Sequence, residues 1–166
     1  MLYLRIAAFA VVGPGTVMVW VPWCLMGHCH VRWPSSGIAG FAGMLLMLCG
    51  LLALAWCVLD FAWRGKGTPA PIDPPKHLVK SGLYRFTRNP MYVGVLMTLC
   101  GEALLWPSWT LVLYTAAIGA VFHLFIRAYE EPTLRRLFGE EYERYCAEVG
   151  RWLPRRPQSA PTPPPQ

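Results

Sequence analysis

The charged residues of this chain are confined to two windows, and this confinement limits the possible folds more than any other feature. Eight charged residues fall between Asp60 and Arg88, thirteen fall between Arg127 and Arg156, and only Arg5, Arg32 and Glu102 lie elsewhere. Charged residues make up 14% of the chain, whereas soluble domains carry roughly 25%. Long uncharged stretches therefore separate two polar windows, and this pattern argues against a free-standing soluble domain.

Two of the uncharged stretches are long enough to cross a bilayer as helices. Ile6 to Met26 spans 21 residues and Gly37 to Leu59 spans 23, and a hydrocarbon core of about 30 Å needs roughly 20 helical residues. The first stretch also exceeds the roughly 7 to 15 apolar residues of a signal-peptide core, and no cleavage site follows it. We therefore expect two transmembrane helices here, and no cleaved leader.

A second pair of spans is expected further along the chain. Ala103 to Ile126 is uncharged, but Pro107 and Ser108 near its start predict that its helix begins around Trp109. Met91 to Trp106 then forms a shorter span of about 24 Å, joined to the next span by a tight turn. Four spans place both termini on one side of the membrane.

The positive-inside rule identifies that side. The middle loop and the tail together carry 13 Lys and Arg residues, whereas the opposite face carries only Arg32. Because cytoplasmic loops are enriched in Lys and Arg, both termini are expected in the cytoplasm. The predicted fold is an all-α integral membrane protein with four transmembrane helices and a cytoplasmic interfacial C-terminal helix.

Other protein classes fit the sequence poorly. The six cysteines lack the spacing of a disulfide framework, and the basic residues follow the ends of apolar stretches instead of lining one face as in nucleic-acid binding. Cys24, His28, Cys29 and His30 are close in sequence but lack a second ligand pair, so no metal site is predicted. The residues from Pro154 onward are rich in proline and are expected to be extended and disordered.

The middle loop combines features of a ligand-binding segment. It carries four prolines between Pro69 and Pro75, which exclude a helix, and it continues with glycines, aromatic residues and separated cations up to Tyr92. Such a segment suits a loop that folds over a polar ligand at the membrane surface. The alternative is a loop that is merely anchored to lipid headgroups.

Two adjacent carboxylates, Glu130 and Glu131, stand where the last apolar stretch ends. Because like charges repel, something should compensate them, and the candidates are Arg85, Arg88, Arg127 and a cationic ligand. The alternative is a solvated helix end. Pro132 is then expected to start a new helix that packs under the membrane helices. Its apolar stripe comprises Leu134, Leu137, Phe138, Tyr142, Tyr145 and Val149.

Three isolated features allow more than one interpretation. Glu102 lies in an apolar span, so it is protonated, lines a polar cavity or lies near the interface, and its nearness to Pro107 favours the far-side interface. His123 is interpreted as a packed polar residue in preference to a proton carrier. Gly37, Gly40 and Gly43 are interpreted as a packing face within the monomer in preference to a dimerisation motif.

Three motifs occur in order along the second half of the chain. They are Arg88-Asn89-Pro90-Met91-Tyr92-Val93-Gly94, the pair Glu130-Glu131, and Phe138-Gly139-Glu140-Glu141-Tyr142-Glu143-Arg144-Tyr145. Together they resemble the isoprenylcysteine carboxyl methyltransferase family and its phospholipid N-methyltransferase relatives, over roughly Gly65 to Arg155. One departure is Asn89, where eukaryotic members usually have His, and we interpret Asn89 as a binding position.

The resemblance implies methyl transfer from S-adenosylmethionine at a cytoplasm-facing pocket, with a lipophilic acceptor entering sideways from the membrane lipids. Arg127 is the candidate for anchoring an anionic acceptor group; alternatively it pairs with Glu130 or Glu131, or contacts lipid phosphate. No metal and no nucleic acid are implied. The residues expected by analogy to line the cofactor pocket are Lys76, His77, Leu78, Val79, Tyr84, Asn89, Pro90, Met91, Tyr92 and Glu130.

The sequence thus divides into residues 1–63, an N-terminal transmembrane hairpin, residues 64–153, a methyltransferase core, and residues 154–166, the proline-rich tail. The predicted function is transfer of a methyl group to a small lipophilic or membrane-embedded carboxylate, amine or thiol. The competing hypothesis is a non-catalytic membrane scaffold or carrier subunit that keeps the fold without turnover. The sequence leaves the acceptor and the oligomeric state open.

Overall fold

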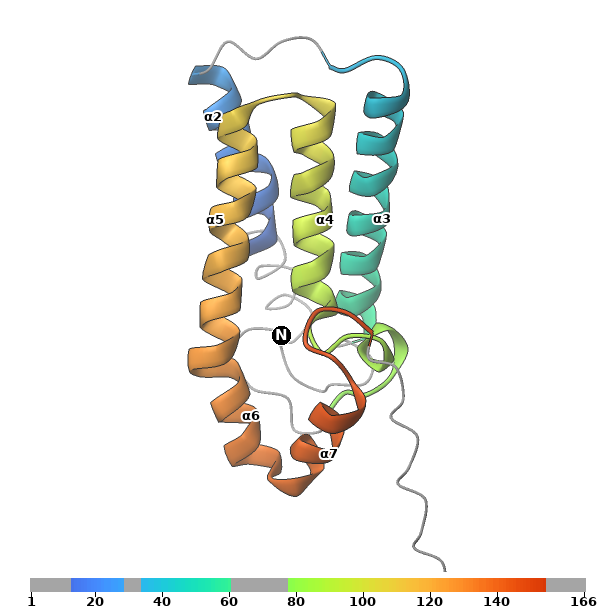
Figure 1. Cartoon of the computed structure of the whole chain (residues 1–166), viewed down its shortest axis with the longest axis vertical. Coiled ribbons are helices and arrows are strands. Elements are labelled where there is room, and N and C mark those ends of the chain that lie inside the picture. The colour runs from blue at the N-terminus through green and yellow to red at the C-terminus, as the bar shows by residue number, and fades with distance from the viewer. Residues whose placement is uncertain (1–12, 29–33, 61–77, 155–166) are drawn as a thin grey trace, which may run out of the picture.

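A computed structural model describes residues 13–28, 34–60 and 78–154 of the chain. The described residues are helical apart from short connections, which confirms the all-helical prediction. Figure 1 shows α2, α3, α4 and α5 side by side with their axes nearly parallel, α4 lying between α3 and α5, and α6 and α7 at one end. The predicted Lys76, His77 and Pro69 to Pro75 lie outside the described residues.

Two helices are long and apolar enough to cross a membrane: α3, Ile38–Asp60, and the continuous helical run Trp109–Phe138. The run consists of α5 (Trp109–Phe125), the π-helical turn η4 (Ile126–Glu130) and α6 (Glu131–Phe138). The starts of α3 and α5 fall within one residue of the predicted positions. Pro132 lies in the first turn of α6, but the expected new helix is a continuation of α5, and that part of the prediction was wrong.

The other two expected spans correspond to α4 and to a first helix of which the structure describes only the part from residue 13. Helix α4, Pro90–Leu105, has 16 residues. The first helix is described from residue 13 to residue 28 and contains the π-helical turn η1 (Thr16–Trp20) followed by α2 (Val21–His28). The described residues therefore include two helices of membrane length, with α4 and the described part of the first helix beside them.

The bundle interior lies between these helices. Met18, Leu54, Val95 and Leu99 form its buried cluster, with Tyr114 and Phe122 of α5 packed against it. Glu102 shares this inward side of α4, is only 8% exposed and lies one turn before the end of the helix, so its predicted position near the far-side interface stays a prediction. Its Oε2 has no hydrogen-bond partner among the described residues.

Helices α3 and α4 approach each other through glycines. A Cβ on Gly43 would lie 2.9 Å from the Gly101 carbonyl oxygen, and one on Gly50 would lie 2.6 Å from the Gly94 carbonyl oxygen. Gly43 and Gly50 are seven residues apart in α3, and Gly94 and Gly101 are seven residues apart in α4. The two glycines of each helix therefore fall on one continuous face. The glycine series thus serves packing within the monomer, as predicted for Gly43.

The C-terminal segment breaks at Gly139, which adopts φ 51°, a conformation that favours glycine. After it, α7 (Glu140–Glu148) runs back under the bundle. Tyr142, Tyr145 and Val149 are buried together with Leu134 and Phe138, as the predicted apolar stripe requires, whereas Leu137 is exposed.

Candidate functional site

The site lies at the charged end of the bundle, where α6, α7 and the 3-10 turn η3 (Gly82–Arg85) meet the first turn of α4 (Figure 1). The segment that leads into η3 is held to the end of α3. Ser81 Oγ donates a hydrogen bond to Asp60 Oδ2 at 3.3 Å. Gly82 has φ 58°, and a Cβ there would lie 2.9 Å from the same carboxylate oxygen, so glycine is required at this turn.

Tyr84 is buried against Cys57 at the end of η3, with Val79 and Met91 packed around it. Its backbone carbonyl accepts a hydrogen bond from the Tyr145 hydroxyl at 2.7 Å. Burial raises the pKa of the Tyr84 phenol well above its usual value, with the Cys57 thiol and the Glu130 carboxylate adding to the effect. Tyr84 is therefore a neutral hydroxyl within electrostatic range of Glu130.

Tyr92 and Glu130 meet across the α4–α5 interface. The Tyr92 hydroxyl donates a hydrogen bond to Glu130 Oε2 at 2.9 Å, and the Tyr92 and Phe122 ring centroids are 4.7 Å apart. Glu130 is the last residue of the π-helical turn η4, and such turns frequently occur at functional sites. Among the described residues, no Lys, Arg or His lies within 4.0 Å of the Glu130 carboxylate.

Glu131 has the opposite surroundings. Arg151 donates to both carboxylate oxygens, Nε to Oε1 at 2.6 Å and Nη2 to Oε2 at 2.9 Å. Arg88 and Arg135 approach the same carboxylate at 3.3 and 3.7 Å. The hydrogen bond to Glu131 raises the pKa of the Arg151 guanidinium. Of the two adjacent glutamates, Glu131 is therefore surrounded by cations, and Glu130 accepts a tyrosine hydroxyl.

The residues after α7 tie α4 and α5 together at this end. The Arg151 carbonyl accepts hydrogen bonds from Thr87 Oγ1 at 2.9 Å and from Asn89 Nδ2 at 3.0 Å. Trp152 Nε1 donates to His123 Nδ1 of α5 at 3.3 Å, in line with a packed polar role for His123. We call residues 150–153 the C-terminal strap. It fixes the start of α4 against the end of α5.

The structure brings together only part of the predicted site. Leu78 packs with the tyrosines of α7, Val79 and Met91 pack with Tyr84, and Pro90 is buried at the start of α4. Asn89 contacts the strap, which is a structural partner, and its predicted role in ligand binding stays a prediction. Of the residues predicted to line the cofactor pocket, Tyr84, Tyr92 and Glu130 have their polar groups in the same region of the structure.

Arg127 is exposed and forms no ion pair with Glu130 or Glu131 in the described part of the chain. The alternative that it pairs with these glutamates was wrong. Arg88, one of the proposed partners, does compensate Glu131, whereas Arg135 and Arg151 were missed. Helix periodicity gives no signal for Arg151, because a helix break and the turn after α7 separate it from Glu131. The adjacent carboxylates were the available clue that more cations were needed.

The geometry defines a helical protein of membrane-length helices whose charged end presents a carboxylate and aromatic rings. The phospholipid methyltransferase family model matches residues 38–141, and the chain belongs to this family. This confirms the resemblance identified from the motifs and extends it to include α3.

Two rice proteins are similar in sequence to part of this chain. The probable protein-S-isoprenylcysteine O-methyltransferases of Oryza sativa subsp. indica and subsp. japonica are each 37% identical to this chain over 78 residues. The match covers 46% of this chain and 40% of each rice protein, so the chain spans well under half the length of these relatives. No solved structure matches the chain significantly.

Proposed function

We propose that the protein is an integral membrane methyltransferase that uses S-adenosylmethionine to methylate a small lipophilic acceptor. The observation that carries this proposal is the Glu130 carboxylate, which accepts the Tyr92 hydroxyl and has no basic partner among the described residues. S-adenosylmethionine carries an ammonium and a sulfonium. A carboxylate beside aromatic rings suits such a cation, because charge attraction and cation–π contacts add in a partly dry site.

The remaining predicted residues complete the proposed pocket. The resemblance assigns Lys76 and His77, which lie outside the described residues, together with Leu78 and Val79 to a loop at the cofactor, and residues 89 to 92 lie at the start of α4. S-adenosylmethionine, when bound, supplies the methyl group, whose carbon–sulfur bond breaks as an acceptor lone pair attacks the methyl carbon. The residues of the chain align the two reactants and exclude water, and neither task needs a covalent intermediate.

Arg127 is proposed to act on the acceptor and not on the cofactor. It lies one turn before Glu130 and is exposed at the boundary between the apolar part of the run and α6. A guanidinium in this position can bind an anionic group of an acceptor that arrives from the membrane. The names of the rice relatives make an S-isoprenylated cysteine the acceptor class to test first.

The proposed membrane arrangement has four spans, with both termini and the active site facing the cytoplasm. In the described residues, every charged side chain except Glu102 belongs to the end of the bundle that carries η3, α6 and α7. The positive-inside rule assigns that end to the cytoplasm. The division into an N-terminal hairpin and a methyltransferase core belongs to the same proposal.

Calorimetry on the purified protein in detergent and in lipid tests the cofactor site. We expect saturable binding of S-adenosylmethionine and S-adenosylhomocysteine, and a loss of about tenfold or more in Glu130→Gln, because a hydrogen bond to a charged group is worth about 1.5–3 kcal/mol. Glu143→Gln is the matched control, since Glu143 is exposed and pairs only with Arg135 among the described residues. Well-folded protein that binds neither compound would refute the proposal and favour a non-catalytic scaffold.

A further inference from the structure

The last residue of α3 is a buried carboxylate. Asp60 is only 7% exposed, and α3, which the structure describes over its whole length, has no basic residue in its last turn. The C-terminus of a helix carries a partial negative charge, so it repels a carboxylate, and burial adds a cost of desolvation. The contacts that compensate Asp60 must therefore come from outside this helix.

The segment that leads into η3 supplies such a contact. Ser81 Oγ donates a hydrogen bond to Asp60 Oδ2 at 3.3 Å. Gly82 is so close that a Cβ there would lie 2.9 Å from the same oxygen and 3.0 Å from Trp56 Nε1. Because Gly82 adopts φ 58°, the chain turns directly against the end of α3. Asp60 thus holds the segment of residues 81–85, which we call the η3 turn.

Tyr84 connects this contact with the proposed cofactor site. Its side chain is buried against Cys57, which lies one turn before Asp60 on α3. Burial raises the pKa of the Tyr84 phenol, and Glu130 and Asp60 are among the acidic neighbours that raise it further. Tyr84 is therefore within electrostatic range of both carboxylates. A displacement of the η3 turn from Asp60 would also displace Tyr84 from Glu130.

Helix α7 holds the η3 turn from the other side. The Tyr145 hydroxyl donates to the Tyr84 carbonyl at 2.7 Å, and the Tyr84 N–H donates to the Ser81 carbonyl at 3.1 Å. Tyr145 is 5% exposed, so water has little access to this contact. Two contacts therefore fix the η3 turn, and Asp60 is the one that ties it to a helix of membrane length.

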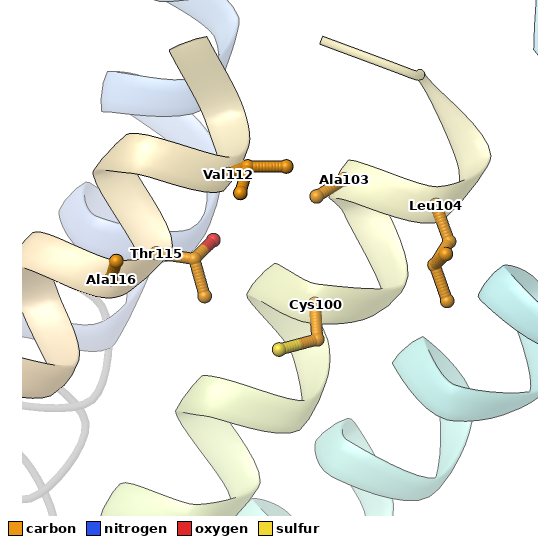
Figure 2. Close-up of a pocket in the computed structure, with 6 residues that line it drawn as sticks. All are labelled: Cys100, Ala103, Leu104, Val112, Thr115 and Ala116. Carbon is orange, nitrogen blue, oxygen red and sulfur yellow. The ribbon is translucent and has the colours of Figure 1, made fainter. Parts of the chain in front are cut away.

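A hollow elsewhere in the bundle does not compete as the cofactor site. It lies between the C-terminal half of α4 and the N-terminal half of α5, and its volume is about 430 Å³ (Figure 2). None of the six lining side chains is charged, and the Thr115 hydroxyl already donates to the Leu111 carbonyl of its own helix at 2.8 Å. The charged groups of S-adenosylmethionine would lack partners there. The lining residues are Cys100, Ala103, Leu104, Val112, Thr115 and Ala116.

We propose that Asp60 is a positioning residue, which holds the η3 turn in the conformation that binds S-adenosylmethionine. This inference rests on the proposed function. Asp60 acts through the turn and does not touch the cofactor, because Ser81 and Gly82 cover its carboxylate. Without Asp60 the η3 turn is ordered for only part of the time. The affinity for the cofactor then falls in proportion to the fraction that stays ordered.

Calorimetry with S-adenosylmethionine on the full chain in detergent tests the positioning role. In Asp60→Ala we expect Kd to rise about tenfold with the number of binding sites unchanged, whereas a general loss of fold would lower the number of sites and leave Kd unchanged. Asp60→Asn should restore most of the affinity, because its amide oxygen still accepts the Ser81 hydroxyl. Equal losses in Asp60→Asn and Asp60→Ala would mean that the negative charge acts on the cofactor directly, and would overturn the proposal.

Ser81→Ala removes the other partner of the same hydrogen bond. We expect Kd to rise about fivefold, and little further when Ser81→Ala is added to Asp60→Ala, because both changes remove one interaction. Ser108→Ala is the matched control, since Ser108 precedes α5 at the opposite end of the bundle and its side chain makes no capping hydrogen bond. Fully additive effects of Ser81→Ala and Asp60→Ala would contradict the proposal.

Hydrogen exchange observes the η3 turn without the cofactor. In Asp60→Ala we expect the backbone amides of residues 82–87 to exchange several-fold faster, and those of α5 to be unchanged. Unchanged exchange in the η3 turn would overturn the proposal. If the unchanged protein does not bind S-adenosylmethionine, the proposed function fails and the positioning role fails with it. If Glu130→Gln loses affinity while Asp60→Ala keeps it, the proposed function stands and the positioning role is refuted.

Discussion

Two neighbouring glutamates with the same side chain serve different purposes in this protein. Glu131 is 4% exposed and lies among Arg88, Arg135 and Arg151, so it holds the C-terminal strap in place. Glu130 accepts a hydrogen bond from the Tyr92 hydroxyl and has no basic partner among the described residues. Consecutive side chains of a helix point about 100° apart, so the two adjacent carboxylates reach different partners.

Replacing Glu131 by glutamine should destabilise the fold. The change leaves the guanidinium groups around it without their counter-charge. Removing one partner of a buried pair costs about 3–5 kcal/mol, and the partial exposure of Arg151 and Arg135 reduces our expectation to about 2–3 kcal/mol. Thermal unfolding in detergent measures the effect. Glu143→Gln, which breaks an exposed pair, should cost less than about 1 kcal/mol, and equal losses in both variants would contradict the assignment.

Replacing Tyr92 by phenylalanine tests the other glutamate. The ring still packs on Phe122, but the hydrogen bond that orients Glu130 is lost. A hydrogen bond worth about 1 kcal/mol corresponds to about a fivefold weaker affinity for S-adenosylmethionine. In Tyr129→Phe, where the ring is exposed and stacks on Phe125, calorimetry should give unchanged affinity. A loss in Tyr129→Phe as large as in Tyr92→Phe would point to a general effect on the fold.

Of the site, the sequence predicted the parts that depend on motifs and missed the parts that depend on tertiary contact. Tyr92 and Glu130 were expected in one pocket, and the structure joins their side chains. Phe122 and Arg151 were not expected there. Phe122 lies in an apolar stretch in which one aromatic residue resembles any other, and Arg151 reaches Glu131 only after the chain reverses at Gly139.

At the scale of the helices, backbone irregularities have identifiable partners. In the π-helical turn η1, the Val21 N–H bonds to the Thr16 carbonyl, whereas a regular helix would direct it to Val17. The released Val17 carbonyl accepts the Tyr114 hydroxyl of α5 at 2.9 Å. This contact ties the first helix to α5. No sequence pattern predicted it, because the apolar periodicity of a membrane helix does not reveal a π-turn.

The close approach of α3 and α4 gives a prediction at this scale. In Gly94→Ala the new Cβ would lie 2.9 Å from the Gly50 carbonyl and 3.2 Å from the Leu54 nitrogen, both backbone atoms. Forcing the helices apart costs about 1–3 kcal/mol, which exceeds the gain of up to about 1 kcal/mol that alanine brings inside a helix. We expect a lower unfolding temperature in detergent.

Gly119 of α5 provides the matched control for that substitution. Its nearest neighbour to a new Cβ is Leu96 Cδ2 at 3.6 Å, an ordinary van der Waals contact with a flexible side chain. Gly119→Ala should therefore leave the unfolding temperature unchanged or raise it, because the helix propensity of alanine is then gained without strain. Similar losses in both alanine variants would mean that the α3–α4 contact is not the limiting one.

The whole molecule is polarised along its helices, and this was the most predictable feature. Charges and prolines mark helix ends strongly because the bilayer tolerates neither unpaired charges nor unpaired backbone groups. The expected helix starts at Gly37 and Trp109 accordingly lie within one residue of those observed. The burial of Glu102 was not predicted, since its position one turn before the end of α4 does not reveal that its side chain is buried.

This polarity predicts the orientation in a membrane. Green fluorescent protein fused after residue 166 should fluoresce in a bacterial host, because the end carrying η3, α6 and α7 concentrates the Lys and Arg residues, and the positive-inside rule assigns such an end to the cytoplasm. Alkaline phosphatase fused after Ser108, in the turn between α4 and α5, should be active, since that turn lies at the opposite end of the bundle (Figure 1). The reciprocal fusions, phosphatase at the C-terminus and fluorescent protein after Ser108, should both be silent. An active C-terminal phosphatase would place the Glu130 carboxylate on the side away from cytoplasmic S-adenosylmethionine and would contradict both the topology and the proposed reaction.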